Sequence, residues 1–151
     1  MIRHQRLKHQ FVEHIPERLA PGVLYVSIEY ATSAHSCCCG CGAEVVTPFT
    51  PTDWRMTFDG ETISLSPSVG NWNIACRSHY FIDRGRVVEA APWTDKQIAS
   101  ERVRDKEAKA LFYGTREATE LNSPPAPVGK GHEAHDKGLL RRLMSKLGWG
   151  D

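Results

Sequence analysis

The chain has 151 residues, 40% of them hydrophobic, and its 19 Lys and Arg against 18 Asp and Glu give a formal charge of +1. This length and composition suffice for one domain with its own hydrophobic core. The balanced charge provides no overall attraction to nucleic acid, and no segment has the ~20 apolar residues of a membrane span. Since the first residues also lack the apolar region of a signal peptide, we expect a cytoplasmic protein without stable membrane insertion.

The segment between residues 10 and 92 has the composition of a β core. Short runs rich in Val, Ile, Tyr, Phe and Thr are separated there by Pro and Gly, a pattern typical of strands joined by turns. The predicted strands are residues 10–15, 23–29, 44–48, 54–58, 62–66, 79–83 and 86–90. Asp59-Gly60 and Arg84-Gly85 predict tight hairpin turns, because these pairs tolerate positive backbone angles.

Two helices are predicted after the strands. The first begins at Thr94, where Thr94 and Gln97 have capping-box spacing, and ends before Gly114. Residues 115–137 contain a Pro- and Gly-rich stretch and are predicted to be a flexible linker. Residues 138–151 carry apolar side chains at helical spacing opposite basic ones, which predicts a short amphipathic basic helix. We expect this tail helix to pack on the domain or a second copy, or to dock a partner protein.

Cysteines form the most informative pattern in the chain. Four of the five are crowded into one loop, at Cys37, Cys38, Cys39 and Cys41. Neighbours this close do not all form unstrained disulfides, and in a reducing compartment the pattern indicates a metal. Zinc prefers thiolate and imidazole donors, which usually arrive as two close pairs from separate loops. The sequence therefore predicts a Zn2+ site between two loops.

The second loop provides Cys76 and His79, spaced as C-x-x-H, as one predicted pair of ligands. In the first loop, glycines allow a tight turn, so Cys39 and Cys41 are the first choice for the other pair. Cys37 replaces either of them in an alternative ligand set. The residues alone leave this choice open.

Two roles are open for such a metal. Four protein ligands make a closed, structural site, whereas three ligands and a water make a catalytic one. In the catalytic alternative a carboxylate takes a proton from the water and an imidazole assists. The predicted catalytic residues are Glu29, at the end of an apolar strand that leads to the cluster, and His35, two residues before Cys37.

Three segments together resemble a bacterial family of small zinc-binding proteins, domain-of-unknown-function family 6527. They are His35-Ser-Cys-Cys-Cys-Gly-Cys-Gly42, Leu65-Ser-Pro-Ser-Val-Gly-Asn-Trp72 and Cys76-Arg-Ser-His-Tyr-Phe-Ile82. The resemblance runs from about Gln10 to Trp93. It implies that the metal ligands are Cys37, Cys39, Cys41, Cys76 and His79, with Cys38 at a variable position.

Members of this family lie beside bacterial operons for ubiquitin-like proteins and their conjugation enzymes. The resemblance thus implies that the partner is a ubiquitin-like protein or one of those enzymes. The most economical function is a zinc-dependent peptidase or isopeptidase that processes or removes the modifier, with Asn71 and Trp72 lining a groove for its extended tail. The alternative is a non-catalytic adaptor, in which a structural zinc scaffolds the conjugation system.

In fold class we expect a β-rich α+β protein, with one small and mostly antiparallel β domain, a zinc site between two loops, one C-terminal helix and the amphipathic tail helix. Residues 1–114 are the predicted zinc-binding domain with its helix. Residues 115–137 are the linker and residues 138–151 the tail helix.

Overall fold

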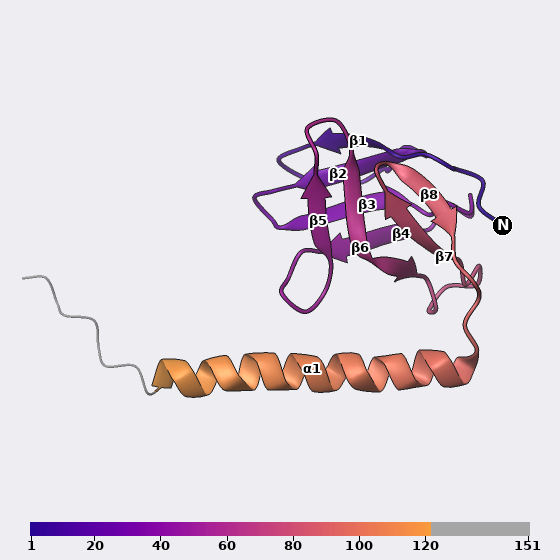
Figure 1. Ribbon diagram of the computed structural model, residues 1–151. Helices are drawn as coiled ribbons and strands as arrows, with labels where there is room; N and C mark the ends of the chain where they lie inside the picture. Colours follow the sequence, from indigo (N-terminus) through magenta and orange to yellow (C-terminus); the bar gives the residue numbers. More distant parts are fainter. Residues whose placement is uncertain (122–151) are drawn as a thin grey trace, which may run out of the picture. The chain divides into compact units, whose positions relative to one another are not determined.

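The computed structural model describes residues 1–121, which form eight strands and one helix (Figure 1). The strands are β1 (Lys8–Phe11), β2 (Val23–Ser27), β3 (Thr32–Ser36), β4 (Glu44–Pro48), β5 (Arg55–Phe58), β6 (Ile63–Gly70), β7 (His79–Asp83) and β8 (Arg86–Glu89), and the helix is α1 (Asp95–Leu121). The predicted tail helix and most of the predicted linker lie outside the described residues.

The strands form two four-stranded sheets. The first sheet has the strand order β1-β2-β3-β4, and the second has the order β5-β6-β7-β8. Among these strands β1 and β2 pair in parallel, and the other neighbours pair antiparallel. The predicted fold class, a small and mostly antiparallel β domain with a C-terminal helix, is confirmed.

One cluster of buried side chains joins the two sheets. Leu24 and Val26 of β2 contribute to it from the first sheet, and Ile63, Tyr80 and Ile82 contribute from the second. Burying an aliphatic or aromatic side chain of this size is worth about 1.5–3 kcal/mol relative to leaving it exposed. This shared core fixes how the loops at the strand ends face each other.

Strand β3 is the strand that the sequence pattern does not predict. Its residues, Thr-Ser-Ala-His-Ser, lack the apolar runs that mark a strand, yet four of its five side chains are buried. The Ser33 hydroxyl forms a hydrogen bond of 2.5 Å with the hydroxyl of Thr47, which lies in the neighbouring strand β4. Pairing with β2 and β4 therefore overrides a weak local preference, and the buried Ser33 hydroxyl has a hydrogen-bond partner within the core.

Helix α1 begins where the capping box predicts. Gln97 N donates to Thr94 Oγ1 at 3.3 Å, and Thr94 N donates to Gln97 Oε1 at 2.9 Å. The helix does not end before Gly114, as the sequence predicts, but continues to Leu121. A single interior glycine costs a helix only about 1 kcal/mol, which its favourable neighbours offset.

The described part of α1 is attached to the strands by one buried side chain and several polar contacts. Ile98 is 6% exposed, and Lys109 Nζ lies 2.7 Å from Asp53 Oδ1 in the segment before β5. Arg77 also pairs with Asp95 at 2.5 Å. Within residues 1–121, no helix is both long and apolar enough to cross a membrane.

Candidate functional site

The loop after β3 and the segment before β7 bring four cysteines together. The Sγ atoms of Cys37, Cys39, Cys41 and Cys76 all lie within 4.8 Å of one another. Cys37 Sγ is 3.4 Å from Cys39 Sγ and 3.9 Å from Cys76 Sγ. Sulfurs bound tetrahedrally to zinc at ~2.3 Å would lie ~3.8 Å apart, so the donor set fits a closed metal site.

The thiols of this cluster differ in acidity. Burial raises the pKa of Cys37, and it raises that of Cys39 to about 12. Burial also disfavours the Cys76 thiolate, but hydrogen bonds from Ser78 and the neighbouring thiols outweigh it and lower the pKa of Cys76 to about 7. Because the pKa values of Cys37 and Cys39 are raised, ionising these neighbouring thiols together is costly unless a cation compensates the negative charge, which is what a bound metal does.

The fifth predicted ligand, His79, is directed away from the sulfur cluster. Its Nε2 lies 2.9 Å from Ser68 Oγ, and its Nδ1 lies 2.8 Å from the backbone oxygen of Ala91. Both ring nitrogens are thus occupied by partners outside the cluster. The structure brings together four of the five predicted donors and places the imidazole in a different site.

The partners of His79 determine which nitrogen carries its proton in the neutral ring. A carbonyl oxygen accepts and cannot donate, so Nδ1 must donate to Ala91 O. Nε2 is then the free lone pair, and it accepts the hydrogen bond from the Ser68 hydroxyl. This is the arrangement in which a histidine can remove a serine proton as general base.

An irregularity in β6 directs Ser68 to His79. Leu65 pairs with Ile82 but Val69 pairs with Tyr80, so the register between β6 and β7 shifts by two residues across Ser66, Pro67 and Ser68. Gly70 pairs directly with His79, and Ser68 is two residues before Gly70, so all three lie on the same face of the sheet. Such bulges commonly redirect a side chain beside a functional site.

Aromatic rings surround His79. Trp72 lies 5.0 Å from it and Trp93 lies 5.2 Å from it, measured between ring centroids, and the two indoles stack at 5.5 Å. Trp72 covers Gly70 so closely that a Cβ there would lie 2.4 Å from the indole nitrogen. Gly70 is therefore required for the indole to reach the histidine.

Ser68 and His79 line a cavity of about 380 Å³. Trp54, Trp72 and Trp93 form apolar parts of its wall. The first turns of α1 form the opposite part, through Ile98, Glu101, Arg102, Asp105 and Lys109. Ser68 itself is partly exposed, so a nucleophile, a base and an accessible space occur in one place.

The two predicted catalytic residues lie outside this cavity. Glu29 is exposed in the turn between β2 and β3, and β3 leads from that turn to Cys37. A strand of this length spans roughly 16 Å, so Glu29 is at the opposite end of the hairpin from the sulfur cluster. Hairpin formation reverses the chain, and the end of the apolar run therefore does not face the cluster.

His35 is in the core rather than at a metal. It is fully buried, and its Nε2 lies 2.8 Å from the hydroxyl oxygen of Tyr80. Burial lowers the pKa of His35 to about 4, so the ring is neutral at physiological pH. A sealed, neutral imidazole has no access to a substrate.

The two predicted substrate-binding residues are separated by the fold. Trp72 lines the cavity. Asn71 faces inward, and its Nδ2 lies 2.9 Å from Ser78 Oγ and 3.5 Å from both Cys37 Sγ and the Tyr80 hydroxyl. Asn71 thus links the sulfur cluster to the core.

Ser68 is not among the residues that the sequence singles out. It does not lie in a G-x-S-x-G sequence, and its histidine is eleven positions away. The available signal is weak: a serine between Pro67 and a Gly-Asn-Trp run, before a C-x-S-H segment. Only the pairing of β6 with β7 shows that these two side chains meet.

The fold and site define a small two-sheet β protein with a serine–histidine pair in a surface cavity and a separate tetracysteine cluster. The chain belongs to the family described as bacterial ubiquitination-like system serine protease (BubE), which it matches over residues 11–90, more than half of its length. The match includes Ser68, His79 and all five cysteines. No curated protein and no solved structure matches the chain.

This family membership corrects the predicted function. The prediction of a zinc-dependent peptidase or isopeptidase is wrong, because the family is described as a serine protease. The alternative of a non-catalytic adaptor gains no support from the match either. The link to bacterial ubiquitin-like systems holds, whereas the resemblance to family 6527 stays a resemblance.

Proposed function

We propose that the chain is a serine protease acting on a ubiquitin-like modifier, with Ser68 as nucleophile and His79 as general base. The observation that carries this proposal is the 2.9 Å contact between Ser68 Oγ and His79 Nε2, in a chain of a family described as serine proteases. The bond cleaved is a peptide or isopeptide bond at the tail of the modifier. The cavity beside the two residues provides space for such a tail.

The reaction follows from the tautomer of His79. Ser68 Oγ attacks the carbonyl carbon of the scissile bond while its proton passes to His79 Nε2. The same proton then goes from Nε2 to the leaving amine, and an acyl-enzyme remains on Ser68. Water attacks that ester, again with Nε2 as base, and its proton returns to Ser68 when the product leaves.

The protonated imidazole formed in each step needs stabilisation. In this chain the partner of Nδ1 is the carbonyl oxygen of Ala91 rather than a carboxylate. The indoles of Trp72 and Trp93 lie within the ~6 Å over which an aromatic ring attracts a cation. A carbonyl dipole and two aromatic rings thus have the role that the aspartate has in a serine–histidine–aspartate triad.

Backbone N–H groups beside the nucleophile are candidates for binding the oxyanion. Asn71 N donates to Ser78 O at 2.9 Å across β6 and β7. Because the hydrogen bonds of an antiparallel pair alternate in direction, the N–H groups of Ser68 and Gly70 are directed away from β7. The pairing of β5 with β6 ends at Ser66, so β5 does not pair with these two residues. We assign the stabilisation of the developing negative charge to these two groups.

The cysteine cluster has a structural part in this proposal. Cys37, Cys39, Cys41 and Cys76 are the ligands, and the ion is Zn2+, since four sulfur donors in a compact set favour zinc. When bound, the ion ties the loop after β3 to the segment that leads into β7. Cys76 is three residues before His79, so this tie also positions the general base.

The test is covalent labelling and cleavage by the purified chain. Ser68→Ala is expected to abolish reaction with a fluorophosphonate probe and to lower cleavage of a ubiquitin-like protein fused at its tail by a factor of at least about 10³. His79→Gln should have a similar effect, because the hydroxyl loses its base. Cleavage is followed by gel and by mass spectrometry.

Ser66→Ala is the matched control, since Ser66 lies in the same bulge but has an exposed side chain without a histidine partner. It should leave labelling and cleavage unchanged. Full cleavage by a folded Ser68→Ala chain would reject Ser68 as the nucleophile.

A further inference from the structure

The outer face of β7 and β8, next to the proposed active site, carries exposed apolar side chains. Phe81 is 48% exposed and Val88 is 46% exposed, and the two residues are paired directly across the strands. Phe81 follows His79 by two positions, so it lies on the same face of the sheet as His79. The Phe81 and His79 rings are 6.1 Å apart between centroids, and the apolar pair is thus continuous with the site.

Two arginines border this apolar pair. Arg86 is two residues before Val88 on β8 and shares its face of the strand. Arg6 forms an isolated antiparallel bridge with Arg86. Leu7 N bonds Gly85 O at 2.8 Å and Val87 N bonds Gln5 O at 2.9 Å on either side of that bridge. The two arginines therefore form the non-hydrogen-bonded kind of pair, in which side chains are closest.

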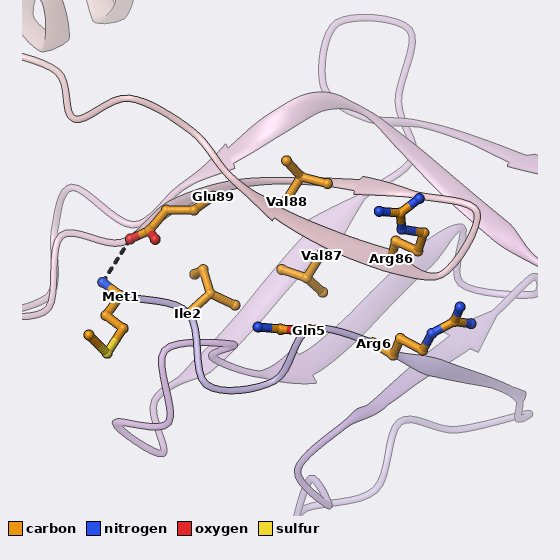
Figure 2. Close-up of a pocket in the computed structure, with 8 residues that line it drawn as sticks. All are labelled: Met1, Ile2, Gln5, Arg6, Arg86, Val87, Val88 and Glu89. Atoms are coloured by element: carbon orange, nitrogen blue, oxygen red, sulfur yellow. Dashed lines mark ion pairs between the residues drawn. The ribbon is translucent and has the colours of Figure 1, made fainter.

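Figure 2 shows this arrangement at the pocket between the N-terminal segment and β8. Arg6 and Arg86 lie at one end of the pocket, and Met1 and Glu89 form an ion pair of 2.7 Å at the other end. Among the described residues, neither arginine has an ion pair or a side-chain hydrogen bond. Asp83 lies opposite Arg86 on β7, but its ion pair is with Arg84, at 3.8 Å. Like charges placed directly opposite each other destabilise a sheet, so the Arg6–Arg86 contact is repulsive.

A partner that supplies negative charge would remove this repulsion. Guanidinium groups bind carboxylates with two parallel hydrogen bonds, and apolar contacts beside such a pair exclude water and strengthen it. An acidic, partly apolar protein surface matches both halves of the patch. Because the patch shares a face with Ser68 and His79, a partner seated on it would hold its tail near the nucleophile.

We infer that this surface, formed by Phe81, Val88, Arg86 and Arg6, docks the folded body of the protein substrate through apolar side chains bordered by carboxylates. The inference rests on the proposed function, since it assigns the surface to the substrate of the same site. The cavity then selects the tail, and the docking surface selects the folded body. A short tail peptide would use the cavity alone.

The experiment compares two substrates with the full chain. One is a ubiquitin-like protein from the same bacterium fused at its tail to a fluorescent protein, and the other is a short peptide of that tail carrying an aminocoumarin. Arg86→Glu is expected to raise KM for the fusion about tenfold, because charge reversal opposes encounter. Peptide cleavage and fluorophosphonate labelling of Ser68 should stay unchanged.

Arg18→Glu is the matched control, because Arg18 is an exposed arginine in the segment between β1 and β2 and is not one of the four patch residues. It should change neither substrate. An equal loss for fusion and peptide, or no loss for the fusion, would overturn the docking surface while leaving Ser68 as nucleophile. If the fluorophosphonate probe does not label Ser68 in the wild-type chain, the proposed function is refuted instead.

A measurement without substitution keeps the inference testable if Arg86→Glu fails to fold. Added salt screens charges between exposed groups. KM of the wild-type chain for the fusion should therefore rise with salt concentration while KM for the peptide stays constant. Equal salt dependence of the two substrates would contradict the inference.

Discussion

Cys76 and His79 are three residues apart, yet they belong to two sites with different physical requirements. Cys76 belongs to a cluster of four cysteine thiols, and burial raises the pKa of two of them, Cys37 and Cys39. His79 enters a pair in which every ring nitrogen already has a hydrogen-bond partner. The cysteine cluster needs an ion to be stable in its ionised form, whereas the Ser68–His79 pair is complete without one.

This difference shows how a small domain can place a loop-stabilising cysteine cluster and a proposed catalytic pair in separate sites. In the proposed function, the segment before β7 is held by the metal at Cys76 on one side and by β7 on the other. Asn71 and Ser78 link the two regions, with Ser78 Oγ 3.2 Å from Cys37 Sγ and 2.9 Å from Asn71 Nδ2. The comparison predicts that loss of a cluster cysteine disturbs the proposed active site, whereas substitution of Ser68 leaves the cysteine cluster intact.

Cys76→Ser gives the largest expected effect. Loss of one of four sulfur ligands should release the metal, lower the free energy of unfolding by several kcal/mol and abolish cleavage, because metal binding energy contributes directly to folding. Metal content by mass spectrometry, chemical denaturation and the cleavage assay measure the three effects.

Cys38→Ala is the control for this substitution, since Cys38 is buried beside the cluster but is not one of its four members. It should keep the metal. A Cys76→Ser chain with unchanged metal content and stability would contradict the assigned ligand set. The complementary half of the comparison is Ser68→Ala, which should leave metal content and stability unchanged.

Tyr80→Phe should have a smaller effect, confined to stability. The Tyr80 hydroxyl is the partner of His35 Nε2, and His35 Nδ1 has no hydrogen-bond partner within residues 1–121. The substitution therefore leaves the buried imidazole without a hydrogen bond to those residues. We expect the free energy of unfolding to fall by about 1–3 kcal/mol. Denaturant unfolding followed by fluorescence measures this change.

Tyr30→Phe is the matched control, because the Tyr30 hydroxyl bonds the exposed ring of His14, at 3.1 Å. Its removal should change stability little. If the two substitutions have equal effects, the buried histidine does not depend on Tyr80.

Gly70→Ala should mainly affect the reaction. A Cβ at Gly70 would lie 2.4 Å from the Trp72 indole, so Trp72 has to move and lose its position against His79 and Trp93. We expect cleavage to fall about tenfold, since a displaced group at the reacting centre weakens catalysis. Metal content should not change.

Gly114→Ala provides a glycine control, because a Cβ there meets nothing within 4 Å. In the interior of α1 this change should stabilise the helix by up to about 1 kcal/mol and leave cleavage unaltered. Normal activity of Gly70→Ala would show that the position of Trp72 is not needed for the reaction.

The sequence determined most of the strands, the two hairpin turns, the capped start of α1 and a cluster of cysteines suited to a metal. Each of these depends on residues close together in the chain: short apolar runs, Asp59-Gly60, the Thr94–Gln97 spacing, and the three clustered sulfurs of the first loop. Local spacing is enough for them, because the interacting groups are a few residues apart.

The tertiary structure decided which partner His79 has. A C-x-x-H spacing permits His79 to be a metal ligand, but the pairing of Gly70 with His79 and the shifted register at Ser68 turn the imidazole to a hydroxyl from another strand. The same hairpin geometry put Glu29 at the end of β3 far from Cys37 and enclosed His35 in the core. These outcomes depend on strand register and sheet packing, and register is set by contacts between residues that are distant in sequence.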